Sequence, residues 1–267
     1  MELLQAISNV GLLRNENEDC VLTCTHPENE NVKLLVVADG MGGKTQGNIA
    51  ANEAIAQIEE WFYHENVEFL NKIDGVDKKL HENVIKINQF LIKKYGKDVL
   101  GTTLTIDVVG EVKTIILNVG DSRAYIYKNK KVWQITEDDS GVWVFYKSGE
   151  VEKDDLRFFP TNNYITACVG LNYELCVSRC YIINNDYDML LLFTDGVTDL
   201  LADTNIRSII DKNKNQNELI LSNIIETAVY KDLKLRVPGY LKRKYKGKFT
   251  VPLHGRDNAS GAIYIKN

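Results

Sequence analysis

The sequence lacks the features that mark an exported or membrane-embedded protein. Its N-terminus has no basic segment followed by an apolar stretch of about 7–15 residues, which a secretory signal requires. Its longest apolar runs have only the length of β-strands, too short to cross a bilayer. We therefore expect a cytoplasmic protein with no membrane partner.

Cysteine is scarce and odd in number, and no CxxC spacing occurs. A chain of 267 residues is too large to depend on disulfides, and unpaired thiols fit a reducing compartment. None of the four histidines falls in a zinc-ligand spacing, which argues against a zinc site. We interpret the cysteines as small apolar residues in or near the core: Cys20, Cys24, Cys168, Cys176 and Cys180.

The chain also lacks internal repeats, linkers rich in glycine, serine or proline, and long tails of one charge sign. The net charge of -5 is mild and indicates no class of partner. An apolar fraction of 44% and a charged fraction of 26% are typical of a globular protein. We predict one domain over residues 1–267, and nothing in the sequence requires more than a monomer.

Apolar runs rich in β-branched residues predict strands, several of them buried on both faces. Apolar residues at helical spacing predict two pairs of amphipathic helices. The predicted strands are 33–38, 103–109, 114–119, 124–127, 189–193 and 262–265, and the predicted helices are 51–62, 80–91, 204–212 and 217–230. Strands and helix pairs come in blocks, which favours an α+β fold with helix pairs over the outer faces of sheets; a doubly wound parallel sheet is the alternative.

Four aspartates lie next to glycine, or within two residues of it, at predicted strand boundaries. Three follow strands, at Asp39-Gly40, Gly120-Asp121 and Asp195-Gly196, and Asp257 precedes the last strand. Carboxylates at strand ends gather at the rim of a rigid sheet, where their mutual repulsion raises their pKa values unless cations lie between them. A single Asp-Gly is usually only a turn, but the repetition favours a site for hard cations such as Mg²⁺ or Mn²⁺.

The chain resembles bacterial metal-dependent protein phosphatases of type 2C from about residue 9 to residue 265. Six of that family's motifs occur in its order and approximate spacing. They are G-x-x-R-x-x-N-E-D at 11–19, D-G-M-G-G at 39–43, G-T-T at 101–103, V-G-D-S-R-A-Y at 119–125, T-D-G at 194–196 and D-N at 257–258. The resemblance implies a four-layer αββα sandwich, in which two antiparallel β-sheets are flanked by antiparallel helix pairs.

The resemblance also implies roles for individual residues. Asp39 would bridge two ions, Asp195 and Asp257 would complete the first, and the carbonyl of Gly40 would bind the second. Asp19 would act through metal-bound water, and Asp121 would help to hold a third, more weakly bound ion. Arg14 would bind the phosphate oxygens with its planar, charged fork. These matched positions are Arg14, Asp19, Asp39, Gly40, Asp121, Asp195 and Asp257.

The implied activity is hydrolysis of phosphoserine and phosphothreonine in proteins by a water or hydroxide that bridges two Mn²⁺ or Mg²⁺ ions. Phosphorylated proteins, the products of a serine/threonine kinase, would be the partners; nucleic acid is disfavoured. The alternative is a catalytically weak regulatory module of the same fold that binds phosphoproteins. A phosphatase for small metabolites is also compatible with the metal motifs.

Lys44 departs from the family pattern, because family members usually carry histidine directly after D-G-M-G-G as the proposed general acid. A lysine can donate a proton, but its high pKa suits that role poorly near neutral pH. Lys44 is therefore either a substitute catalytic acid or a solvated loop residue. Asp139 likewise stands where the family often has histidine.

Two segments differ from the common core of the family. An aromatic-rich segment near 139–165 matches the variable flap, and it could select substrates or simply pack on the core. An insertion near 231–252 includes the stretch 231–248, which has eight basic residues and one acidic residue, Asp232. It could be a solvated insertion, a docking surface for an acidic or phosphorylated partner, or a nucleic-acid contact.

Overall fold

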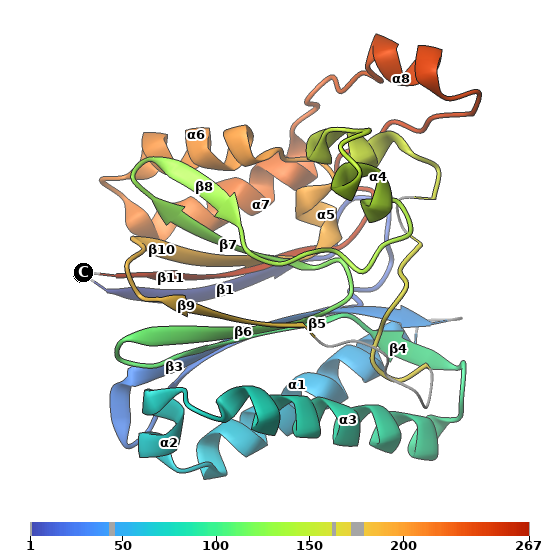
Figure 1. Ribbon diagram of the computed structural model, residues 1–267. Helices are drawn as coiled ribbons and strands as arrows, with labels where there is room; N and C mark the ends of the chain where they lie inside the picture. The colour runs from blue at the N-terminus through green and yellow to red at the C-terminus, as the bar shows by residue number, and fades with distance from the viewer. Residues whose placement is uncertain (1, 43–45, 162–163, 172–178, 267) are drawn as a thin grey trace.

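The computed structural model shows two stacked β-sheets with helices on both outer faces (Figure 1). It describes residues 2–42, 46–161, 164–171 and 179–266. Every strand pair among these residues is antiparallel. The predicted α+β sandwich is therefore confirmed, and the doubly wound parallel alternative is wrong.

The first sheet has the strand order β1-β11-β10-β7-β8. Its strands are β1 (Leu3–Asn9), β11 (Ala259–Ile265), β10 (Met189–Phe193), β7 (Arg123–Lys128) and β8 (Lys131–Gln134). The second sheet has the order β2-β3-β5-β6-β9, and β4 pairs with the end of β3. Its strands are β2 (Asp19–His26), β3 (Asn29–Gly42), β4 (Leu100–Thr102), β5 (Leu104–Val109), β6 (Lys113–Val119) and β9 (Arg179–Asn184).

The helices form the outer layers. Helices α1 (Gly47–His64), α2 (Val67–Lys72) and α3 (Val76–Tyr95) cover the second sheet, and α5 (Asp195–Thr198), α6 (Asp203–Asn213), the 3-10 helix η2 (Asn217–Leu219) and α7 (Ile220–Tyr230) cover the first (Figure 1). The remaining elements are α4 (Trp143–Lys147), the 3-10 helix η1 (Lys153–Phe158) and α8 (Gly239–Lys244). No helix in the described part of the chain is long and apolar enough to span a membrane.

Alternation along the central strands divides the core into three apolar layers. On β3, Leu34 and Val36 pack toward α1 and α3, whereas Leu35 and Val37 pack between the sheets. A third cluster joins the first sheet to α6 and α7. Because both faces of β3 are buried, its sequence is a continuous apolar run instead of an alternating one, as predicted.

Strands β1, β2, β8 and β9 were not predicted from the sequence. Most of their residues are only half-buried, so polar residues interrupt their apolar pattern. Cys20, Cys24 and Cys168 are half-buried free thiols, as expected. Cys180 is exposed, contrary to the expectation, and Cys176 lies outside the described residues.

The segments predicted as flap and insertion pack against each other. A buried cluster contains Trp143, Phe158 and Phe159 from the first segment and Leu241 from the second. Phe159 stacks on Phe145, at 5.3 Å between ring centroids. Figure 1 shows α8 and its flanking chain on the side of α4 that faces away from the sandwich.

Candidate metal centre

Asp39 lies at the end of β3, where backbone bonds from neighbouring motifs hold it. Its N–H donates to Thr103 Oγ1 at 2.9 Å, and its carbonyl accepts from Thr103 N at 2.9 Å and from Thr102 Oγ1 at 3.0 Å. Thr103 Oγ1 also bonds Ser122 Oγ at 2.9 Å. The G-T-T motif and the serine beside Asp121 therefore position the backbone of Asp39.

The glycines after Asp39 and Asp195 are required by close backbone packing. A Cβ on Gly40 would lie 2.1 Å from the carbonyl oxygen of Gly47, and one on Gly196 would lie 1.8 Å from that of Asn258. Real Cβ atoms do not approach that closely, so a side chain at either position would push the elements apart. Glycine here permits α1 and the 257–258 turn to lie against the acidic strand ends.

Asn258 joins the N-terminal loop to the C-terminal strand. Its Nδ2 donates to the carbonyls of Val10 at 2.9 Å and Glu16 at 3.0 Å, and its Oδ1 accepts from Glu18 N at 2.9 Å. The loop that carries Arg14 is thereby held beside Asp257. These bonds explain why the first and last of the six motifs meet across the length of the chain.

Arg14 forms an ion pair with Asp257. Its Nη2 lies 2.8 Å from Asp257 Oδ1 and 2.9 Å from Oδ2, and its Nη1 lies 3.8 Å from Glu18 Oε2. The side chain is 46% exposed, so the guanidinium is accessible at the rim of the site. A planar fork that already binds a carboxylate can bind phosphate oxygens by the same geometry.

Asp19 is buried beside Asp39, with which it is paired across β2 and β3. Its Oδ2 accepts from Thr194 Oγ1 at 2.9 Å, and Thr194 directly precedes Asp195. The pKa of Asp19 is raised to about 7, because burial and, less strongly, the charge of Asp257 outweigh the lowering by hydrogen bonds to Ser260 and Thr194. Asp19 therefore belongs to the acidic cluster.

Mutual repulsion connects all five predicted acids. Burial, followed by the charges of Asp19, Asp121 and Asp257, raises the pKa of Asp39 well above its usual value. The pKa of Asp195 is raised well above its usual value by burial and then by Asp39. Burial raises the pKa of Asp121 to about 7. The structure therefore brings together side chains from five of the six motifs.

The buried oxygens of this cluster fit a hard divalent cation. Asp19 Oδ1 and Asp195 Oδ1 are buried without a hydrogen-bond partner, and an unpaired buried carboxylate oxygen is costly. All the donors are oxygens, which Mg²⁺ and Mn²⁺ prefer. In the described ranges, however, no three acidic, histidine or cysteine side chains already form a set that could hold an ion. The arrangement is a cluster of buried and half-buried acids and not a closed coordination sphere.

The remaining predicted positions are Gly40, Lys44 and Asp139. Gly40 lies beside Asp39 at the end of β3, and its N–H donates to the carbonyl of Glu18 at 3.1 Å. Lys44 falls outside the described residues. Asp139 is buried, accepts from Gly120 N at 3.1 Å and pairs with Arg179 Nη1 at 2.5 Å, so it supports the turn that carries Asp121.

The prediction from sequence missed Asp199 and the role of Arg123. Asp199 follows Asp195 by one helical turn, and its charge raises the pKa of both Asp195 and Asp121; the spacing D-G-V-T-D was its available signal. Arg123, in the G-D-S-R motif, is buried and pairs with Asp138 at 2.6 Å. Its guanidinium carbon also lies 5.9 Å from the ring centroid of Trp143, so it links the motif to α4.

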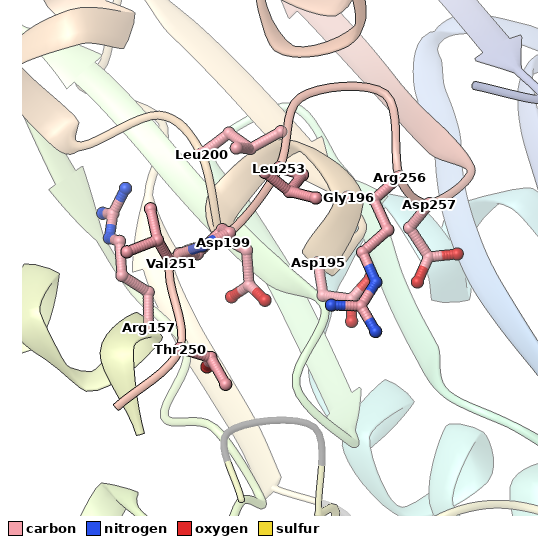
Figure 2. Close-up of a pocket in the computed structure, with 11 residues that line it drawn as sticks. Arg157, Asp195, Gly196, Asp199, Leu200, Thr250, Val251, Leu253, Arg256 and Asp257 are labelled. Atoms are coloured by element: carbon pink, nitrogen blue, oxygen red, sulfur yellow. The ribbon is translucent and has the colours of Figure 1, made fainter. Parts of the chain in front are cut away.

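A pocket opens directly beside the acidic cluster (Figure 2). Figure 2 shows Arg256 pointing toward the carboxylates of Asp195 and Asp257, with Arg157 on the far wall. The lining residues are Arg157, Asp195, Gly196, Asp199, Leu200, Thr250, Val251, Pro252, Leu253, Arg256 and Asp257. The cluster therefore shares a cavity with the flap, through Arg157, and with the end of the insertion.

The chain is similar to known phosphatases. The model of the family Protein phosphatase 2C matches residues 15–218. Serine/threonine phosphatase stp of Listeria welshimeri is 27% identical over 212 residues, which cover 78% of this chain and 82% of the relative. The crystal structure of Stp1 from Staphylococcus aureus, 26% identical, superposes with a TM-score of 0.79 over 100% of this chain and 96% of that one. The catalytic domain of PstP, solved in complex with 2 manganese ions, shares the fold at 22% identity, with a TM-score of 0.74 and coverage of 99% and 97%.

Proposed function

Because the chain belongs to the protein phosphatase 2C family, we propose that it hydrolyses phosphoserine and phosphothreonine in proteins and requires divalent metal ions. The observation that carries the proposal is the cluster of buried and half-buried, mutually repelling acids at the sheet rim, with Arg14 accessible beside it. Such a cluster is costly for a fold that does not use it to bind cations.

The ligand set that we propose follows the family motifs. Asp39 would bind two ions. The other ligands of the first ion would be Asp195 and Asp257, and the carbonyl of Gly40 would bind the second ion. Asp19 would act through water, and Asp121 with Asp195 would hold a third, weaker ion. Bound divalent ions would supply water activation and neutralise the charge of the phosphoryl group. The supporting observations are the burial of Asp19 and Asp121, the half-buried positions of Asp39, Asp195 and Asp257 beside them, and the unpaired buried oxygens of Asp19 and Asp195.

The chain's own side chains would bind and orient the phosphate. Arg14 would exchange part of its contact with Asp257 for phosphate oxygens, since its fork is held at the rim and is half-exposed. Asp257 would then be released toward a cation. Lys44 would supply the leaving-group proton. We further propose that the whole chain is one catalytic domain, monomeric and cytoplasmic, that acts on the phosphoprotein products of a serine/threonine kinase.

The test is hydrolysis of an aryl phosphate and of a phosphothreonine peptide with Mn²⁺, with Mg²⁺ and after chelation. We expect turnover that stops on chelation and in the Asp39→Ala and Asp195→Ala variants. Asp74→Ala, at an exposed position in the turn before α3, is the matched control and should retain full activity. Turnover that survives chelation would contradict the proposal.

A catalytically weak phosphoprotein-binding module is the second candidate, favoured only by lysine at position 44. Metal binding and phosphopeptide binding without turnover would select it. If Lys44 is the proton donor, Lys44→His should speed hydrolysis of alkyl phosphates more than of an aryl phosphate, whose leaving group needs less protonation. Equal effects on both substrates would remove Lys44 from the chemistry.

A further inference from the structure

The basic stretch 231–248 is two-sided. All eight of its Lys and Arg side chains are exposed, whereas its apolar and aromatic side chains are buried or half-buried. The exposed set is Lys231, Lys234, Arg236, Lys242, Arg243, Lys244, Lys246 and Lys248, which we call the basic face. The segment therefore presents one sign of charge to solvent from a packed support.

That support is the flap. Leu241 is fully buried in the cluster with Trp143 and Phe159, and Tyr245 packs edge-on against Phe159 at 5.4 Å between centroids. Tyr240 Oη donates to Asp155 Oδ2 at 2.7 Å, and Thr250 N donates to the Phe158 carbonyl at 2.9 Å. The basic face thus has a defined place on the molecule, unlike a solvated loop.

The charges of the basic face are largely uncompensated. Lys244 pairs with Glu150 at 3.3 Å, and none of the other seven makes an ion pair within the described part of the chain. The stretch carries a net +7, which leaves -12 for the rest of a chain with a total of -5. An extended polyanion such as RNA or an anionic membrane would meet this acidic remainder, whereas a short acidic peptide need not.

The basic face runs directly into the catalytic pocket. Two residues after Lys248, Thr250–Leu253 line the pocket together with Asp195 and Asp257. A protein chain whose phosphorylated residue enters this pocket would therefore place its neighbouring residues on or beside the basic face. This continuity favours the substrate itself, over an unrelated partner, as the occupant.

We propose that the basic face is a docking surface for acidic residues that flank the phosphorylated residue of the substrate protein. The inference rests on the proposed phosphatase function and adds to it a substrate class. Electrostatic attraction at an exposed surface raises association rate and specificity more than it affects chemistry. It should therefore act on kcat/KM for acidic phosphoproteins and leave small substrates unaffected.

The first experiment compares the variant Lys242→Gln/Arg243→Gln/Lys246→Gln with the control Lys78→Gln/Lys86→Gln/Lys93→Gln. All six positions are exposed. The control residues lie on α3, at the opposite side of the sandwich (Figure 1). Both sets of substitutions remove the same amount of charge. For a phosphothreonine peptide with flanking aspartates, we expect kcat/KM to fall about tenfold at low salt in the first variant alone. The same peptide with asparagine flanks, and an aryl phosphate, should be hydrolysed at unchanged rates.

The second experiment does not depend on turnover. Fluorescence anisotropy measures the affinity of an unphosphorylated, fluorescent, aspartate-rich peptide. The peptide should bind the wild-type chain, and its affinity for the first variant should be about tenfold lower. Added salt should progressively weaken its binding to the wild-type chain. Equal behaviour of the two variants in both assays would overturn the docking proposal while hydrolysis of the aryl phosphate still supports the phosphatase function. Binding of RNA or of phosphatidylserine vesicles through these residues, without binding of the acidic peptide, would overturn it as well. An inactive chain that still binds the peptide through the basic face would instead count against the proposed catalysis.

Discussion

The acidic cluster and the basic face are opposite in charge and in environment. The acids are buried or half-buried at the ends of strands, where loss of solvent and then mutual repulsion raise the pKa values of Asp39 and Asp195. The basic residues are exposed on a segment that is attached to the outside of the sandwich by its aromatic side. Burial of a charged acid lowers the folding stability and makes its pKa sensitive to neighbouring charges. An exposed basic residue has little effect on folding stability and can be replaced individually.

The largest expected effect lies in the acidic cluster. Asp39→Asn should reduce kcat about a thousandfold, or about 4 kcal/mol of barrier, because the variant loses the proposed bridging ligand. The same change should raise the melting temperature of the metal-free protein, since it removes a buried charge from among like charges. Kinetics and thermal unfolding in EDTA measure the two effects. A variant that is less stable in EDTA would show that Asp39 is held by favourable contacts and not by repulsion.

Two motif arginines test burial against exposure. Arg123→Ala should cost about 3–5 kcal/mol of unfolding free energy, because it leaves Asp138 buried without its partner. Arg14→Ala should change stability by less than about 1 kcal/mol, because that pair is half-exposed. It should nevertheless lower kcat/KM for every phosphate ester. Urea unfolding of both variants, with the wild type as reference, distinguishes them; equal stability losses would contradict the distinction.

The acidic cluster should make the stability of the metal-free protein depend on pH. Folding raises the pKa of Asp19 and Asp121 from 3.8 to about 7, so the folded state binds more protons and metal-free stability falls as pH rises through this window. Between pH 5 and 7 we expect a loss of about 2 kcal/mol from each of these two carboxyl groups, or about 4–5 kcal/mol together. Mn²⁺ should flatten the slope by replacing the protons. Chemical unfolding at both pH values, with and without Mn²⁺, measures the free energy of unfolding. If its change between the two pH values is the same with Mn²⁺, this would argue against ion binding by these acids.

Asp107 provides a buried acid outside the cluster. It lies on β5, fully buried, with both carboxylate oxygens lacking a hydrogen-bond partner, and burial alone raises its pKa. Asp107→Asn should stabilise the protein by about 1–2 kcal/mol at pH 8 and less at pH 5, because a raised pKa makes the neutral carboxyl more populated at the lower pH. Activity and its metal dependence should not change. A loss of metal affinity in this variant would show that the acidic site extends into the core.

The prediction from sequence succeeded where apolar residues form an unbroken run or a regular helical stripe. Strand β3 and helices α1 and α7 have long apolar runs or stripes. The predicted ranges 51–62 and 217–230 lie close to α1 and α7, and 33–38 matches the buried centre of β3. Strands β1 and β2 were missed because half-buried strands mix polar and apolar residues. For the site, the motifs identified the acids that meet at the rim. They did not reveal Asp199, whose influence depends on how α5 is oriented.

The sequence by itself determined the chemistry: a set of aspartates at strand ends, an arginine to bind phosphate, and a basic stretch with alternating apolar residues. Only the tertiary structure decided that these acids repel one another in a buried site, that Arg14 pairs with Asp257, and that the basic stretch packs on the flap beside the pocket. The physical reason is that residue type is local, whereas burial, pKa and contact depend on segments that are far apart in the chain, such as those of Arg14 and Asp257, which are 243 residues apart.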